Sequence, residues 1–127
     1  MTLVVDASAI AELLLRTDRG AQMAGVIAQE HLVAPPHLTV EVVSVLRRWN
    51  LSDLITGQEA RRALQIFRQL GIHELPAADL LNDVWELRHN TSAYDAMYVA
   101  LARRLGCKLL TLDARLGKTA PETVMTI

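Results

Sequence analysis

Four acidic residues, far apart in the chain, have the types and positions needed to hold a divalent cation. They are Asp6, Glu41, Asp95 and Asp113. Asp6 and Asp113 each follow an apolar run typical of a buried strand, and Glu41 and Asp95 lie in the first turns of expected helices. Carboxylates gathered without matching basic side chains repel one another, so a cluster of them requires a cation. Carboxylate oxygens suit Mg²⁺ and Mn²⁺, which points to phosphodiester chemistry.

The apolar pattern that must position these acids predicts five short strands alternating with helices. The strands are expected at residues 3–5, 31–34, 72–75, 108–112 and 123–127. The helices are expected at about residues 8–15, 21–30, 38–49, 57–70, 78–88 and 92–105, with a turn over 17–20. Strands that alternate with helices are typical of a parallel sheet covered by helices on both faces. We therefore expect an α/β fold, a three-layer α/β/α sandwich with a five-stranded, mostly parallel sheet.

Local signals indicate where several of the helices begin and end. Thr56 and Glu59 have the spacing of a capping box, in which each side chain satisfies a free backbone N–H of the first turn. Ser92 has the position of a residue that opens a helix. Gly71 and Gly106 have the positions of glycines that end one in a left-handed conformation.

The length and composition are those of an ordinary globular protein. The chain has 127 residues, which favours a single domain over residues 1–127. It contains one cysteine, so no internal disulfide is expected, which fits a reducing compartment. No signal peptide is visible, and no apolar run approaches the ~20 residues that span a membrane. We interpret the protein as cytoplasmic, with no membrane partner.

The topology predicts that the four acids meet at one edge of the sheet. In a parallel sheet, ligands bind beyond the C-terminal ends of the strands. Asp6 and Asp113 are the first residues past two expected strands, whereas Glu41 and Asp95 begin helices that start near the same edge. Each acid also has an ordinary explanation: Asp6 as a turn or N-cap residue, Asp113 as a turn residue, Asp95 as the partner of Ser92 in a capping box, and Glu41 as a solvated residue. Four of them at one edge form a candidate site.

The overall charge argues against one class of nucleic-acid-binding protein. With 13 basic and 14 acidic residues the net charge is −1, whereas a protein that coats nucleic acid is usually clearly basic. A nuclease is not excluded, because metal ions can supply positive charge at the phosphate. Arginine pairs at 47–48, 61–62 and 103–104 are either solvated helix faces or phosphate-binding groups.

The histidines and the cysteine do not have the spacing of a zinc site. They are His31, His37, His73, His89 and Cys107. Structural zinc sites combine four such ligands at short, regular spacings. We therefore interpret the histidines as ordinary surface or hydrogen-bonded residues and Cys107 as a small buried apolar residue.

Four segments resemble the motifs of the PIN-domain ribonucleases, and most of all the VapC toxins of bacterial toxin–antitoxin pairs. They are VVDAS at 4–8, Glu41 early in the helix after the second strand, YDAMYVALA at 94–102 and TLDARL at 111–116. The resemblance covers essentially the whole chain, and the chain does not depart from the family pattern at the four acids. It implies a PIN-like fold with a five-stranded parallel sheet.

The resemblance also implies an activity and roles for individual residues. The chain would be a Mg²⁺-dependent endoribonuclease acting as the toxin of such a pair, with Mn²⁺ able to replace Mg²⁺. Asp6 and Asp95 would bind the metal directly, and Asp113 would hold that ion or a second one, directly or through water. Glu41 would bind or activate a metal-bound water.

Two hydroxyl residues belong to the same motifs. Ser8 stands two residues after the first acid, and Thr111 two residues before the last one. The resemblance implies that these hydroxyls orient the carboxylates that bind the metal.

The expected partners are RNA, a second copy of the chain and an antitoxin. Val40 and Val43 give the helix at 38–49 a second apolar face, which predicts a homodimer or packing on the helix at 57–70. The resemblance implies a homodimer, with the possibility of a hetero-oligomer with a small VapB-like antitoxin. The C-terminal segment of such an antitoxin often places a basic side chain in the acidic site.

Two alternative functions are consistent with parts of the pattern. One is a non-catalytic PIN scaffold that binds RNA or protein through the same groove, which the intact acids argue against. The other is a receiver-like signalling domain with a phospho-accepting aspartate. It would require an acidic pair after the first strand and a lysine after the last, whereas Asp6 is followed by Ala7 and no such lysine is present.

Overall fold

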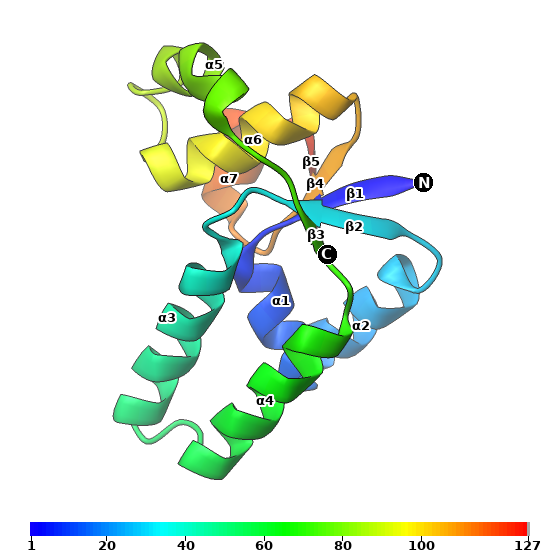
Figure 1. Ribbon diagram of the computed structural model, residues 1–127, viewed down its shortest axis with the longest axis vertical. Helices are drawn as coiled ribbons and strands as arrows, with labels where there is room; N and C mark the ends of the chain where they lie inside the picture. The colour runs from blue at the N-terminus through cyan, green and yellow to red at the C-terminus, as the bar shows by residue number, and fades with distance from the viewer. Residues whose placement is uncertain (127) are drawn as a thin grey trace.

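The computed structural model describes residues 1–126 and contains a five-stranded sheet in which every pairing is parallel (Figure 1). The strands lie in the order β3-β2-β1-β4-β5. Their bounds are β1 Thr2–Val5, β2 His31–Ala34, β3 His73–Glu74, β4 Lys108–Leu110 and β5 Val124–Met125. The five expected strands and their parallel arrangement are confirmed, with the third, fourth and fifth shorter than predicted. The last residue of the expected fifth strand, Ile127, lies outside the described residues.

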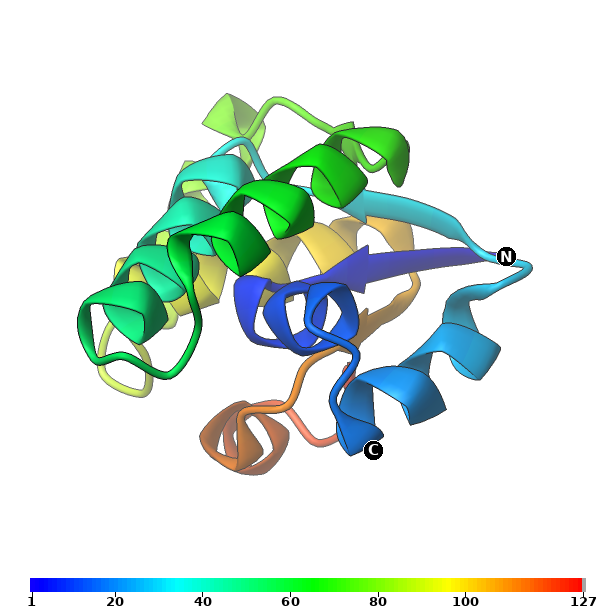
Figure 2. The same cartoon turned by 90° about the horizontal axis from the view of Figure 1, so that it is seen from below.

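Helices cover both faces of this sheet. Their bounds are α1 Ala7–Leu14, α2 Asp18–Ile27, α3 Leu38–Leu51, α4 Gly57–Gln69, α5 Leu81–Glu86, α6 Ala93–Leu105 and α7 Ala114–Thr119, with a 3₁₀ turn at Ala78–Leu80. Helices α2, α3 and α4 all pack against α1, whereas α6 packs against β1 and β4 and carries α5. Figures 1 and 2 show these two groups on opposite sides of the strands. The fold is the three-layer α/β/α arrangement that the strand and helix pattern predicted.

The sheet and the inner helix faces form an aliphatic core. Val4, Val5 and Leu109 are fully buried in the central strands, and Leu38 and Val42 are fully buried on α3. A buried central strand must be apolar on both faces, which is why these strands read as continuous apolar runs rather than alternating ones. Asp6, the first polar residue after β1, is therefore held in a fixed position at the edge of the packed core.

The helix boundary signals act as predicted in α4 and α6. The Thr56 hydroxyl accepts the Glu59 N–H and the Glu59 carboxylate accepts the Thr56 N–H, both at 3.0 Å. Ser92 caps α6, and Gly106 ends it with a φ of 66°. Gly71 follows α4 with the same φ of 66°. Local hydrogen bonds and a left-handed glycine are sufficient to set these ends.

The start of α2 is an expectation that was wrong. The segment 17–20 was expected to be a turn and the helix to run over 21–30, but α2 is Asp18–Ile27. Thr17 is its N-cap, and the Thr17 hydroxyl accepts the Gly20 N–H at 3.0 Å. The glycine that favoured a turn lies inside the helix instead, because α1 and α2 approach closely there.

Two further differences concern short elements. The helix expected at 78–88 is divided into the 3₁₀ turn Ala78–Leu80, which buries Leu80, and the short helix α5. Helix α7 was not predicted. It has six residues, one of them Gly117, and its start depends on the Asp113 side chain, which accepts the Arg115 N–H at 2.9 Å. A helix this short gives almost no periodic signal.

The outer face of α3 remains exposed. Helix α4 packs beside α3. Val40 nevertheless stays 70% exposed and Val43 44% exposed. Packing on α4 therefore does not bury this second apolar face.

Within residues 1–126 the structure has no helix long and apolar enough to cross a membrane.

The close approach of α1 and α2 gives a matched pair of stability predictions. A Cβ added at Gly20 would lie 2.2 Å from the Glu12 carbonyl oxygen, so Gly20→Ala must displace backbone and is expected to lower the free energy of unfolding by about 1–3 kcal/mol. Gly25 lies on the same helix with nothing within 4 Å of an added Cβ, so Gly25→Ala is expected to raise it by about 0.5–1 kcal/mol. Urea denaturation measures both. Equal effects of the two changes would contradict the close contact.

Candidate active site

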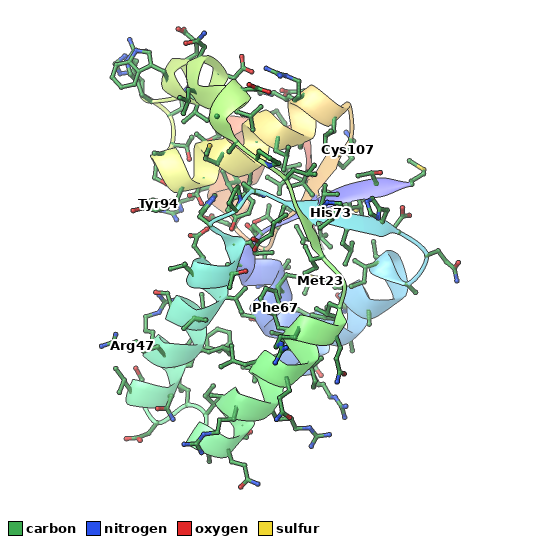
Figure 3. All side chains as sticks on the ribbon, viewed as in Figure 1. Met23, Arg47, Phe67, His73, Tyr94 and Cys107 are labelled. Atoms are coloured by element: carbon green, nitrogen blue, oxygen red, sulfur yellow. The ribbon has the colours of Figure 1, made fainter. Side chains whose placement is uncertain are left out.

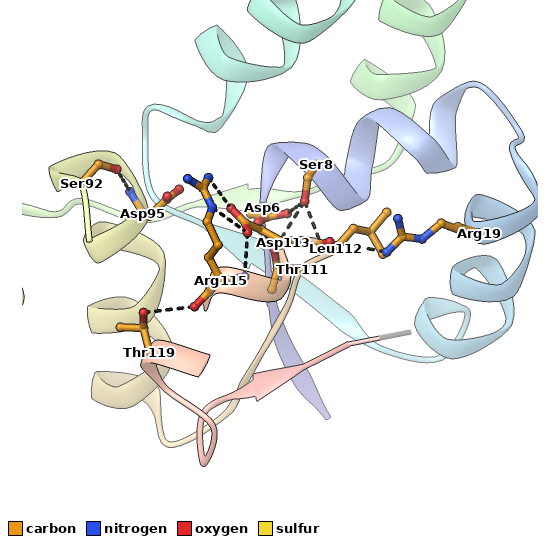
Figure 4. A network of polar contacts seen from close by, with 10 residues as sticks. All are labelled: Asp6, Ser8, Arg19, Ser92, Asp95, Thr111, Leu112, Asp113, Arg115 and Thr119. Atoms are coloured by element: carbon orange, nitrogen blue, oxygen red, sulfur yellow. Dashed lines mark hydrogen bonds and ion pairs between the residues drawn. The ribbon is translucent and has the colours of Figure 1, made fainter. Parts of the chain in front are cut away.

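The four predicted acids line one cavity at the C-terminal edge of the sheet. The cavity has a volume of about 420 Å³, and its wall includes Asp6, Glu41, Asp95 and Asp113. Figure 4 shows three of them, Asp6, Asp95 and Asp113, from three separate elements. Asp6 follows β1 and precedes α1, Glu41 and Asp95 lie in the first turns of α3 and α6, and Asp113 precedes α7. The sheet topology places them together because the C-terminal ends of parallel strands, and the starts of the helices that follow them, lie at the same edge.

Asp6 is buried and has no basic partner among residues 1–126. It is 5% exposed and caps α1 through its Oδ1 atom, which accepts the Ala9 N–H at 3.0 Å and the Ser8 hydroxyl at 2.7 Å. The Thr111 hydroxyl donates to the other oxygen, Oδ2. Burial raises the pKa of Asp6 to about 6 even though these three hydrogen bonds oppose the rise, and the charge of Asp95 raises it further. The carboxylate is thus fixed in orientation but not compensated in charge.

Ser8 and Thr111 join the two halves of this edge. Each hydroxyl has one proton, which it donates to Asp6. As acceptors, the Ser8 oxygen receives the Leu112 N–H at 3.1 Å and the Thr111 oxygen receives the Asp113 N–H at 3.0 Å. These bonds tie the segment after β1 to the segment after β4 (Figure 4). The two predicted hydroxyls therefore hold the Asp6 carboxylate from two sides.

Asp95 shares the cavity with other negative charges. Its backbone N–H donates to the Ser92 hydroxyl at 3.2 Å, which fixes the start of α6. The pKa of Asp95 is raised, first by burial and then by the charges of Asp113 and Glu41, while Arg115 and Ser92 lower it. Unlike a fully solvated capping residue, this carboxylate is partly buried and is repelled by the charges of two other acids of the cavity.

Asp113 has a basic partner that sequence reasoning missed. The Arg115 guanidinium binds both oxygens of Asp113, at 3.2 Å from Nε and 2.9 Å from Nη2. These bonds, together with backbone N–H groups at the start of α7, hold the pKa of Asp113 below its usual range although burial opposes this. The two residues lie two positions apart in the TLDARL segment. The sequence therefore shows that they are close, but not that their side chains form an ion pair. Asp113 is the one predicted acid in an ion pair with an arginine among residues 1–126.

Glu41 is oriented by two residues that were not predicted to belong to the site. The Tyr98 hydroxyl donates to Glu41 Oε1 at 2.6 Å, and burial is the main reason that the pKa of Tyr98 is raised, so it remains a donor. His37 Nε2 lies 3.1 Å from the same oxygen and 3.0 Å from the Tyr94 carbonyl oxygen. Both neighbours are acceptors, so Nε2 carries the proton that they share. The four-residue spacing of His37 and Glu41 on one helix was the available signal.

The cavity suits a cation that keeps part of its water shell. Among residues 1–126, no three His, Cys, Asp or Glu side chains stand close enough together to hold a metal ion by themselves. Burial, with some repulsion between the carboxylates, nevertheless raises the pKa values of Asp6 and Asp95, and neither acid is in an ion pair among residues 1–126. Mg²⁺ typically takes one or two protein carboxylates and several waters. The residues present fit that pattern better than a complete protein cage.

Comparison with known proteins identifies the family. Residues 3–121 match the PIN domain family model. The chain is 44% identical to Ribonuclease VapC9 of Mycobacterium tuberculosis over 92% of this chain and 90% of that protein. It is 41% identical to Ribonuclease VapC1 of the same organism over 90% of this chain and 87% of that protein.

Two solved structures have the same fold. One is VapBC2 from Rickettsia felis bound to a DNA fragment from its promoter, with a TM-score of 0.72, 12% identity, and coverage of 99% of this chain and 98% of that one. The other is VapC20 of Mycobacterium tuberculosis, a toxin that cleaves the sarcin–ricin loop, with a TM-score of 0.67, 22% identity, and coverage of 94% of each chain. The sequence relatives, the family model and the fold agree: the chain belongs to the PIN-domain family and, within it, to the VapC ribonuclease toxins of toxin–antitoxin systems.

Proposed function

We propose that this ribonuclease is a Mg²⁺-dependent endoribonuclease whose ion is held by Asp6 and Asp95. Asp113 holds the same ion or a second one, directly or through water. The observation that carries this proposal is the convergence of four carboxylates on one cavity, where burial and mutual repulsion raise the pKa values of Asp6 and Asp95. Carboxylates that remain ionised in such a place lower the free energy of unfolding, and a bound cation offsets that cost.

The carboxylates differ in how freely they can bind. Asp6 is held by Ser8 and Thr111, yet a carboxylate has about four lone-pair positions and these bonds leave room for a cation. Asp95 forms no ion pair among residues 1–126, although the charge of Arg115 acts on it. Asp113 must first loosen its contact with the Arg115 guanidinium. Asp6 and Asp95 are therefore the primary ligands in this proposal.

Glu41 is the group that takes the proton from the attacking water. Tyr98 and His37 both bind Oε1, whereas Oε2 has no hydrogen bond among residues 1–126 and can accept that proton. The fixed Oε1 holds the carboxylate in one orientation, which is what a general base requires. A Mg²⁺ ion, when bound, makes the water easier to deprotonate and offsets negative charge in the transition state.

The first prediction concerns the metal and Asp95. Purified protein is expected to cleave RNA in Mg²⁺ or Mn²⁺ and to lose cleavage in EDTA. Asp95→Asn is expected to lower the rate about 100-fold or more, because it removes a charge that binds the cation. Cleavage is followed by gel electrophoresis of end-labelled RNA.

A control with the same change of charge is available outside the cavity. Asp53 has a left-handed backbone with φ of 61°, a conformation that asparagine also adopts readily, so Asp53→Asn is expected to retain full activity. Equal cleavage by the wild type in EDTA and in Mg²⁺ would reject the metal mechanism. Folded wild-type protein that cleaves no RNA under any of these conditions would support a scaffold role instead.

The second prediction concerns the pH dependence of stability. The folded chain raises the pKa of Asp6 from 3.8 to about 6 and so binds that proton more tightly than the unfolded chain does. The contribution of Asp6 to the free energy of unfolding of the metal-free protein therefore falls as the pH rises from 3.8 through about 6. Asp6→Asn removes the buried charge and keeps a residue suited to capping α1. At pH values well above the pKa of Asp6, the metal-free variant is expected to be more stable than the wild type by about 1–3 kcal/mol.

Urea denaturation over a pH series measures this difference. The variant is expected to retain a shallower slope, because Asp95 also has a raised pKa. Mg²⁺ is expected to stabilise the wild type and not the variant. An Asp6→Asn protein that is less stable than the wild type above pH 7, measured in EDTA, would show that the buried carboxylate is not a net cost.

A further part of the proposal concerns partners. Support for a VapB-like antitoxin comes from the VapC relatives and from the R. felis structure, in which VapB and VapC form a complex. Support for a homodimer comes from Val40 and Val43, which remain exposed on α3. An antitoxin side chain with a positive charge would compensate the same carboxylates that a metal ion does.

The third prediction follows from this competition for charge. Co-expression with a VapB-like antitoxin is expected to give a complex in which Mg²⁺-dependent RNA cleavage is suppressed. Native mass spectrometry gives the number of copies of each chain in the complex. Two copies of the toxin are expected. A complex that cleaves RNA as fast as the free protein would contradict inhibition at the site.

A further inference from the structure

The cavity continues beyond the carboxylates, along helix α3. Its wall includes Glu41 in the first turn of α3, then Val45, Arg48 and Trp49. From Glu41 to Arg48 the helix rises about 10 Å, because each residue adds about 1.5 Å. This end of the cavity is therefore separate from the carboxylates, and the proposed cleavage mechanism uses none of its residues.

Arg48 is a free cation at this end. It is exposed, and its side chain takes part in no ion pair among residues 1–126. The acid on the facing helix α1, Glu12, accepts a hydrogen bond from the Thr17 hydroxyl instead. An unpaired guanidinium on a cavity wall offers a planar set of donors that fits phosphate oxygens.

The neighbouring arginine is placed differently. Arg47 does not line the cavity and points outward from α3 (Figure 3). From the sequence, the pair at 47–48 is either part of a solvated helix face or a phosphate-binding group. The structure separates the two residues: Arg47 faces solvent, and Arg48 faces the cavity.

Trp49 adds an aromatic surface next to Arg48. It is partly buried against the core and lines the same cavity. Proteins that bind single-stranded nucleic acid combine basic groups that follow the backbone with aromatic rings on which bases stack. Arg48 and Trp49 provide one of each, about 10 Å of helix away from Glu41.

We propose that this end of the cavity is a binding subsite for a nucleotide next to the cleavage site of single-stranded RNA. Arg48 binds the phosphate of that nucleotide and Trp49 stacks on its base. The inference rests on the proposed function in one respect, that the ligand is RNA. The two residues position the substrate and take no part in the chemical step.

The first test compares Arg48→Gln with Arg47→Gln. The probe is a mixed-sequence single-stranded RNA of about 12 nucleotides, with Ca²⁺ in place of Mg²⁺ to suppress cleavage. Arg48→Gln is expected to weaken binding about tenfold, as the loss of a charge-assisted bond predicts. The slope of log affinity against log salt is expected to fall by about 0.7, the value for one phosphate contact on a single strand. Arg47→Gln removes the same charge one residue away and is expected to match the wild type.

The second test observes Trp49 directly. The chain has two tryptophans, and the other, Trp85, lies exposed on α5, outside the cavity. In a Trp85→Phe background, saturating RNA is expected to quench the emission of Trp49 because a base stacks on its ring. Adding Arg48→Gln is expected to shift the same quenching to about tenfold higher RNA concentration.

Kinetics separate this inference from the proposed function. Arg48→Gln is expected to raise KM and leave kcat unchanged, because the lost contact is equally strong in ground and transition states. A wild type that cleaves RNA, with Arg48→Gln and Arg47→Gln indistinguishable in salt slope, would overturn the inference and leave the proposed function standing. A wild type that binds RNA through Arg48 but never cleaves it would support the subsite and overturn the proposed function. RNA binding that is absent altogether, or Trp49 emission that saturating RNA does not change, would also overturn the subsite.

Discussion

The buried carboxylate of Asp6 is the interaction on which the rest of the site depends. Asp6 directly follows the central strand β1, caps α1 and accepts hydrogen bonds from the hydroxyls of Ser8 and Thr111. One side chain thus joins the segments after β1 and β4. Burial raises its pKa because none of these partners carries a positive charge. Asparagine would cap the helix equally well without that cost. A charge retained where a neutral residue would suffice for the fold indicates a role that requires the charge.

The other acids of the site are compensated to different degrees. Asp113 is neutralised by Arg115, and Glu41 shares its Oε1 with the Tyr98 hydroxyl and the His37 ring. Asp95 instead faces other carboxylates, which raise its pKa. Of the four acids of the site, Asp6 and Asp95 are therefore the two that form no ion pair with a basic side chain among residues 1–126, and they are the two proposed as primary ligands. Hydroxyl and ring donors thus orient Asp6 and Glu41 without a full positive charge from an arginine or lysine, which is consistent with the proposed metal site.

Helix α3 serves three surfaces with one sequence. Leu38, Val42 and Leu46 are buried against the core. Glu41, Val45, Arg48 and Trp49 line the cavity, whereas Val40 and Val43 remain exposed on the outer side. A period of 3.6 residues allows this division, because residues three, four or seven positions apart share a face. The proposed subsite at Arg48 and the proposed contact with a second copy can thus be altered independently on the same helix.

Local patterns in the chain were enough to predict the layers of the fold and the position of the site. Apolar runs indicated the strands, helical periodicity indicated most helices, and the parallel topology then brought Asp6, Glu41, Asp95 and Asp113 to one edge. These features depend on short-range patterns and on the few connections that a parallel sheet allows. The same short-range reasoning was wrong at α2, where a glycine that favours turns lies inside a helix because another helix passes close to it.

Which side chains contact one another could not be predicted in this way, because it depends on how the elements pack. The Tyr98 hydroxyl reaches Glu41 from a segment distant in the chain, and the raised pKa of Asp6 depends on burial. Arg48 and not Arg47 lines the cavity because of how α3 packs. Even the local pair of Asp113 and Arg115 depends on the backbone conformation at the start of α7. A sequence pattern specifies which face of a helix is apolar, but a polar side chain takes its partner from whatever the packed core places beside it. The burial that leaves Asp6 without compensating charge exists only once the sheet has formed around it, and for that reason the electrostatics of the site could not be derived from the order of its residues.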